Sequence, residues 1–357
     1  MRIKRSLPIL LGVVVIAAAV TLVVQIRKHA PPEPARLLPG ADAFLYINLK
    51  WVRTVNAVNQ LPPVSHDPEY EQFIQETGFQ FERDLDEAAF AVHYPVASSS
   101  PAHPASMQTR FSEVLIGKIQ ADRLAAYLRK LTKSVDIYGT KEIYNIPLEG
   151  RTVRVSILGV DKVAISNHDD PSVIRGMIDR SRKLASPFRG PAFLRQYYKH
   201  VPIASLAWAI VRVEPDRGLF AGNSLFLFPK PAVLLISARY LRALHLKAEA
   251  FTASPDDAQQ ITEKLNAFLT LFHAAESSVT THGTDADVKT FFESLKVEQQ
   301  KDRAVLTTTV PPGFLRKVLT EAPSVTAPMA PAESPKTEAP QAPTQAAPRK
   351  KRHKAAE

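Results

Sequence analysis

The pattern of apolar and polar positions divides the chain into an uncharged opening stretch, a long periodic body and a polar tail. Residues 7–26 contain no charged side chain. A helix of this length rises about 30 Å at about 1.5 Å per residue, the thickness of the hydrocarbon core of a bilayer. A cleavable signal peptide has a shorter apolar region, roughly 7–15 residues. The pattern therefore predicts an uncleaved transmembrane helix at 7–26.

The charges on either side of this stretch predict its orientation. Three basic residues precede it and two follow it: Arg2, Lys4, Arg5, Arg27 and Lys28. Because the excess lies on the amino-terminal side, the positive-inside rule places residues 1–6 in the cytoplasm and the body on the far side. Cleavage after Ala19 is the alternative, although it would leave residues 20–26 as an exposed apolar terminus. Residues 27–36 are rich in proline and read as a stiff spacer.

Beyond the spacer, the periodicity predicts both strands and helices. Alternating or β-branched segments predict strands at 43–50, 87–95, 112–119, 142–148, 151–158, 161–167, 232–240, 244–253, 294–300 and 303–310. Helical spacing and end signals predict helices at 67–78, 120–133, 170–184, 254–276 and 311–319. The first of these helices has Asp67 as N-cap, Pro68 in its first turn and Gly78 as its stop.

The order of these elements occurs twice along the body. A strand, a strand, a helix, further strands and a helix follow one another around 87–183 and again around 232–319. Strict alternation of strands with helices, which a parallel sheet requires, is absent. We therefore expect an α+β fold with antiparallel sheets, helices packed on one face and a duplicated unit, after one transmembrane helix. The two units are predicted at 37–185 and 186–321.

The net charge of +10 lies mainly at the two ends of the chain. The first 29 residues carry +5 and residues 322–357 carry +3, which leaves +2 for the body. A nucleic-acid-binding face needs cations concentrated on the fold, so no nucleic-acid partner is expected. Residues 322–357 are rich in proline and alanine and are predicted to be disordered. They end in a basic cluster, formed by Arg349, Lys350, Lys351, Arg352 and Lys354.

Reactive motifs are absent from the sequence. It contains no cysteine, so disulfides, thiolate metal sites and a lipid-carrying cysteine are excluded. It has no G-x-S-x-G, H-E-x-x-H, P-loop or G-x-G-x-x-G pattern, and we predict no catalytic residue, cofactor or metal. The densest polar cluster is His168, Asp169 and Asp170. Either it meets a metal, or it forms a helix N-terminus in which Asp170 is the cap.

The stretch 218–238 is the most apolar part of the body. A second membrane span is one interpretation, but Lys230 and two prolines lie within it. The other is a buried strand at 232–240 preceded by an apolar loop at 219–228. That loop either packs into the core or forms an exposed patch that contacts lipid, membrane or a partner. Its apolar contact residues would be Phe220, Leu225, Phe226 and Phe228.

Two segments resemble a loose group of uncharacterised bacterial exported proteins. They are "LLPGADAFLYIN" (37–48) and "ETGFQFERDLDEAAFAV" (76–92). The resemblance implies an N-terminal anchor and a duplicated α+β body, and it implies no activity or site residue.

Together these features predict a single-pass protein of the bacterial inner membrane, with its body facing the periplasm or the cell exterior. The expected role is non-enzymatic binding or scaffolding. An apolar-ligand carrier, for a ligand such as lipid, is the first alternative, and an unrecognised hydrolase is the second. The expected partners are the membrane, through residues 7–26, and an envelope protein, anionic polymer or lipid. The basic tail either contacts such a partner or only solubilises the chain.

Overall fold

A computed structural model describes residues 30–56, 66–95, 109–182, 190–215, 226–279 and 286–314. The predicted transmembrane helix at 7–26, the tail at 322–357 with its basic cluster, Phe220 and Leu225 lie outside these ranges. No helix within the described ranges combines the length and the apolarity that crossing a bilayer requires.

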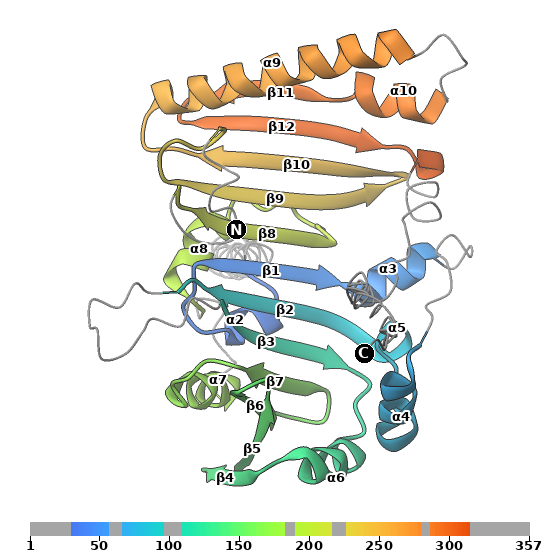
Figure 1. The fold of residues 1–357 in the computed structure, drawn as a ribbon, viewed down its shortest axis with the longest axis vertical. Helices are drawn as coiled ribbons and strands as arrows, with labels where there is room; N and C mark the ends of the chain where they lie inside the picture. Colours follow the sequence, from blue (N-terminus) through green and yellow to red (C-terminus); the bar gives the residue numbers. More distant parts are fainter. Residues whose placement is uncertain are drawn as a thin grey trace, which may run out of the picture. The chain divides into compact units, whose positions relative to one another are not determined.

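In the described residues, twelve strands form one continuous antiparallel sheet in the order β11-β12-β10-β9-β8-β1-β2-β3-β7-β6-β5-β4 (Figure 1). The strands are β1 (Ala43–Asn48), β2 (Leu85–His93), β3 (Arg110–Gly117), β4 (Ser134–Tyr138), β5 (Lys141–Leu148), β6 (Arg151–Ile157), β7 (Lys162–Ser166), β8 (Ala207–Val213), β9 (Ala232–Leu241), β10 (Ala243–Phe251), β11 (Lys296–Gln300) and β12 (Arg303–Val310). The helices are α2 (Glu33–Leu37), α3 (Leu49–Asn56), α4 (Pro68–Thr77), α5 (Phe81–Asp84), α6 (Ala121–Leu131), α7 (Ser172–Arg182), α8 (Ala192–Tyr198), α9 (Pro255–Val279) and α10 (Ala286–Glu293).

Helices cover both faces of the sheet. Successive side chains of a strand point to opposite faces. The neighbours Leu234 and Leu235 of β9 therefore show which helices cover each face of the sheet. Leu235 belongs to the core formed with α2, α7 and α8, and we call this side the α8 face. Leu234 packs with Ile261 and Leu265 of α9, and we call this side the α9 face. The prediction of helices on one face is therefore wrong, because strands such as β9 bury apolar side chains on both sides.

The α8 face carries the main core. Phe44, Ile210 and Leu235 are fully buried there, although they come from β1, β8 and β9. Ala35 and Leu37 of α2 belong to the same core. Part of the segment predicted to be a spacer is therefore a buried helix, and proline at its start is compatible with a first helical turn.

Within the described residues, three further clusters with helices over them lie on the α9 face, beside a small cluster that joins Ala43, Val92 and Val211 of β1, β2 and β8. One is formed by α9 over β9, β10 and β12. A second joins aromatic residues of α4 and α5 to β2 and β3, and a third places α6 over β5, β6 and β7. A long sheet thus has several local cores on this side rather than one.

Both predicted ends of the helix at 67–78 and the predicted start of the helix at 254–276 are confirmed, whereas this second helix continues to Val279. Asp67 accepts a hydrogen bond of 2.7 Å from the Tyr70 backbone N–H, and Gly78 has φ 70°, a left-handed value that suits glycine. Ser254 accepts a hydrogen bond of 3.2 Å from the Asp257 N–H. Strong local end signals therefore gave correct boundaries.

The two halves of the sheet share a strand order around the central β1–β8 pair. In the first half, β1, β2 and β3 are neighbours, and β7 returns beside β3 after α6. In the second half, β8, β9 and β10 are neighbours, and β12 returns beside β10 after α9. The first half has two additional strands at its outer edge. β1 and β8 are antiparallel, as a two-fold relation between the halves would require.

Candidate functional site

Beyond α8, the α8 face of the sheet changes from apolar to polar. On β10 every second residue points to this side, and these residues are His245, Lys247, Glu249 and Phe251. A solvated face is common in antiparallel sheets, so polar residues alone need no special function. This part of the face also contains a buried carboxylate and two recesses, and these are the features that call for an explanation.

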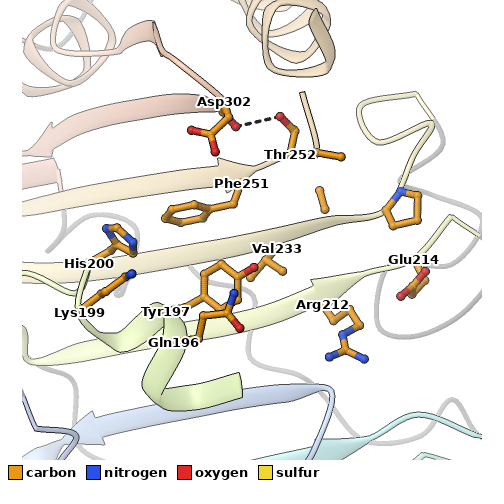
Figure 2. Close-up of a pocket in the computed structure, with 13 residues that line it drawn as sticks. Gln196, Tyr197, Lys199, His200, Arg212, Glu214, Val233, Phe251, Thr252 and Asp302 are labelled. Carbon is orange, nitrogen blue, oxygen red and sulfur yellow. Dashed lines mark hydrogen bonds between the residues drawn. The ribbon is translucent and has the colours of Figure 1, made fainter. Parts of the chain in front are cut away.

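One recess lies between α8 and the ends of β8, β9 and β10, and it has a volume of about 420 Å³ (Figure 2). Val233 and Phe251 form part of its floor, and polar groups from four chain segments surround them. The lining includes Gln196, Tyr197, Lys199, His200, Arg212, Glu214, Thr252 and Asp302. We call it the α8 pocket.

Phe251 is held in place by three neighbours. Its ring centroid lies 5.2 Å from that of Tyr197 and 4.8 Å from that of His200, and the Arg303 guanidinium lies 5.3 Å from it. Edge-to-face rings and cations over ring faces are favourable arrangements. On the opposite wall Thr252 donates its N–H and its hydroxyl to the Asp302 carbonyl, at 3.0 and 2.8 Å. The pocket is therefore built from ordered groups.

Glu249 lies beside this pocket and is fully buried. Its Oε1 accepts a hydrogen bond of 3.1 Å from Arg303, and its Oε2 lies 3.1 Å from the Lys247 ammonium without hydrogen-bond alignment. A buried carboxylate is costly unless paired. The two flanking cations, which reach solvent, provide that pairing.

Charges of both signs line the α8 pocket. Lys199 and Arg212 are cations, whereas Glu214 and Asp302 carry carboxylates. Arg212 also lies 3.6 Å from the Asp42 carboxylate and 4.9 Å from the Phe193 ring centroid, which positions its guanidinium.

His200 contributes a neutral group to this pocket. Burial lowers the pKa of its imidazole, Arg303 lowers that pKa further, and Glu249 acts in the opposite direction. At neutral pH His200 is therefore an uncharged imidazole with one donor and one acceptor. Nowhere in the described ranges do three His, Asp or Glu side chains form a group that could hold a metal ion.

A second, chemically different cavity lies on the α9 face, under α4 and α6. It has a volume of about 140 Å³ and an almost wholly apolar lining. Three phenylalanines dominate it, with ring-centroid distances of 5.6 Å for Phe73–Phe81 and 5.3 Å for Phe79–Phe81. Phe81 is 39% exposed and lies at the outer side. Leu115, Val155 and Val163 of the sheet are also part of the lining.

The predicted apolar contact residues lie in different environments. Phe228 is buried in the cluster under α9, on the α9 face. Phe226 is 64% exposed, and the Lys264 ammonium lies 5.6 Å from its ring centroid. Exposed Phe268 and Leu271 belong to α9 as well. Phe220 and Leu225 lie outside the described residues.

Phe226→Asp is expected to change the free energy of unfolding by no more than about 0.5 kcal/mol, because the ring is mostly exposed. Chemical denaturation of the full chain in neutral detergent measures this. A loss of several kilocalories per mole would show that the ring is part of the core.

The polar cluster at 168–170 forms the start of α7. Asp170 accepts hydrogen bonds of 2.8 and 2.5 Å from the Ser172 N–H and hydroxyl, and Asp169 pairs with Arg110. His168 lies with its ring centroid 5.1 Å from that of His93. These contacts match the capping interpretation.

The His93–His168 pair should make the fold sensitive to acid. Burial lowers the pKa of His93 to about 4, with His168 and Arg110 adding to the effect and Asp42 opposing it. Burial also lowers the pKa of His168. The unfolded chain binds a proton at each of these histidines below about pH 6.5. The folded chain binds these protons only at lower pH. The contribution of the two neutral histidines to the free energy of unfolding is therefore complete above about pH 6.5 and is lost as the pH falls toward 4.

His93→Gln can still pair with Ser112, to which His93 Nε2 is 3.2 Å away, and it removes the titration. We expect the free energy of unfolding of this variant to fall less steeply between pH 6.5 and 4 than that of the wild type. Parallel slopes in urea denaturation series would contradict this prediction.

Comparison with known proteins finds only distant likeness. No family model matches the chain, and no curated protein matches it. The solved structure of crystal form III of TP0453 is similar over 82% of this chain and 99% of that chain, with a TM-score of 0.42 and 10% identity. Crystal form I of TP0453 is similar over 82% of this chain and 98% of that chain, with a TM-score of 0.40 and 10% identity. This distant structural similarity assigns no family and no function to the chain.

Sequence reasoning did not find the α8 pocket. Lys199 and His200 follow a short helix in a stretch, 186–217, for which no element was predicted. The available signal was the alternation of β10, where charged residues share one face. It indicates a polar face, but it does not indicate which segments meet there.

Proposed function

We propose that this protein is a non-enzymatic binding protein of the bacterial envelope, anchored in the inner membrane by residues 7–26 with its sheet exported. The uncharged stretch and its flanking charges support the anchor and the orientation. The shared strand order of the two halves supports the duplicated unit at 37–185 and 186–321. An active alkaline phosphatase fused after residue 321 would agree with export, and a stable but inactive fusion would contradict it.

The α8 pocket is the proposed binding site, and a small zwitterionic ligand such as a short peptide is its proposed ligand. The observation that carries this proposal is a recess of about 420 Å³ with cations and carboxylates around a partly apolar floor. Lys199 and Arg212 suit a ligand carboxylate, and Glu214 and Asp302 suit an ammonium group. Val233 and Phe251 suit an apolar side chain.

Ala253→Trp tests this assignment, because Ala253 is an exposed lining residue whose enlargement would obstruct the pocket. Alanyl-alanine and other dipeptides should raise the Tm of the wild-type chain and leave that of Ala253→Trp unchanged. Ala267→Trp, at an exposed position of α9, is the matched control and should respond like the wild type. Equal responses in all three proteins, or none, would overturn the assignment.

The apolar cavity under α4 and α6 favours a second candidate function, the binding of an apolar group. A cavity of about 150 Å³ lined by apolar side chains stays dry and accepts benzene, and this cavity has about 140 Å³. Benzene should therefore raise the Tm, and Val155→Phe, which fills the cavity, should remove that effect. Such a site suits one ring or a short alkyl segment rather than a whole lipid.

A further inference from the structure

A second recess on the α8 face lies farther along β9, β10 and β12, with a volume of about 440 Å³. Its lining is basic and rich in hydroxyl groups, and we call it the basic groove. The cations are Arg239, Lys247 and Lys296, and the polar neutral groups include Ser237, His245, Thr307 and Thr309. None of these residues belongs to the lining of the α8 pocket.

Strand register places these groups in two adjacent rows across the sheet. One row is Arg239, His245 and Thr309, and the other is Ser237, Lys247, Thr307 and Lys296. Lys247 and Lys296 are two strands apart, about 10 Å. Arg239 and Lys247 are diagonal neighbours, about 7–8 Å apart at the backbone. The three long side chains can therefore converge on one ligand.

The charges of the groove are only partly balanced by the protein. Within the described ranges, Arg239 and Lys296 have no carboxylate within ion-pair distance. Lys247 is paired with buried Glu249, and the one acid in the lining, Glu293, lies 3.7 Å from Lys289. Like charges on neighbouring strands repel one another. A bound anion would remove this repulsion.

The surroundings of these cations are ordered. The Thr309 hydroxyl lies 3.1 Å from His245 Nδ1. Ser294 accepts a hydrogen bond of 2.9 Å from the Thr309 N–H and lies 2.9 Å from the Thr308 hydroxyl, which fixes the end of α10 beside the groove. Rigid strands therefore present both the cations and the hydroxyl groups.

We propose that the basic groove binds a phosphate group carried by a larger molecule. Arginine and lysine recognise phosphate oxygens through charge-assisted hydrogen bonds, and hydroxyl groups supply further donors. The groove volume exceeds what a single phosphate needs, so the remainder of the ligand lies along the strands. A soluble phosphate ester and a phospholipid headgroup share this chemistry.

The test uses the full chain in neutral detergent and three probes: inorganic phosphate, glycerol 3-phosphate, and micelles containing phosphatidylglycerol. The variant is Arg239→Gln with Lys296→Gln. We expect at least one probe to raise the wild-type Tm, and its affinity to fall about tenfold or more in the variant. Higher salt should weaken binding to the wild type. The probe that binds identifies the source of the phosphate.

Lys118→Gln with Lys133→Gln is the matched control, because both lysines are exposed, lie outside the groove and carry the same total charge. It should bind the probe like the wild type. Without ligand, the groove variant should be at least as stable as the wild type, because repulsion is relieved. Lack of response to all three probes, equal binding by the groove variant, or equal weakening in the control would overturn the proposal. These outcomes are independent of dipeptide binding in the α8 pocket.

Discussion

The Phe44→Ala variant is expected to lose about 3–5 kcal/mol of unfolding free energy and to unfold in one transition. Phe44 is fully buried on β1, the strand that pairs with β2 of the first half and β8 of the second. Its ring lies 6.1 Å from that of Phe193, between centroids. The cavity left by alanine would therefore weaken a core that both halves share.

Urea denaturation followed by far-ultraviolet circular dichroism and by tryptophan fluorescence measures this effect. The fluorescence comes from Trp208, which is buried in the same core, and from Trp51 of α3, whose ring centroid lies 5.6 Å from that of Tyr240 of β9. Coincident curves with a lowered midpoint are the expected result. Two separate transitions would show that the predicted units 37–185 and 186–321 fold independently. Phe226→Ala is the control, and its exposed ring should make the change small.

Arg303→Met is expected to cost about 3 kcal/mol, because removing one partner of a buried ion pair leaves a desolvated charge. Glu249 is fully buried and would keep only Lys247, whose ammonium is not aligned for a hydrogen bond. Methionine keeps most of the length of the side chain over Phe251, so the loss would reflect the charge more than the packing.

The double variant Arg303→Met with Glu249→Leu separates these contributions. If the penalty comes from the uncompensated carboxylate, replacing that carboxylate should restore much of the stability, since apolar replacements of buried pairs are often neutral. Denaturation midpoints of the two single variants and the double variant give the coupling. Additive losses would refute this electrostatic explanation.

Local patterns predicted most of the strands and the best-capped helices. The residues 232–240 and 244–253, for example, form β9 and β10 within a residue or two. Other elements had weaker local signals. Helix α2 begins with prolines in a polar segment, and its helical state is stabilised by burial of Ala35 and Leu37 in the core.

The faces of the sheet could not be predicted in the same way. Leu234 and Leu235 are neighbours in an apolar run, and such a run does not say which helix covers which side. The continuity of the sheet depends on the β1–β8 pairing, which joins residues far apart in the chain. Nothing in either strand alone specifies that partner.

The sequence by itself determined the α+β class, the positions of strongly periodic elements and the concentration of charge at the chain ends, because these follow from neighbouring residues. Only the tertiary structure decided that helices cover both faces of the sheet and that Phe228 is buried whereas Phe226 is exposed. It also decided that Arg239, Lys247 and Lys296 line one groove. Those outcomes depend on strand order and register, which arise from contacts between distant segments.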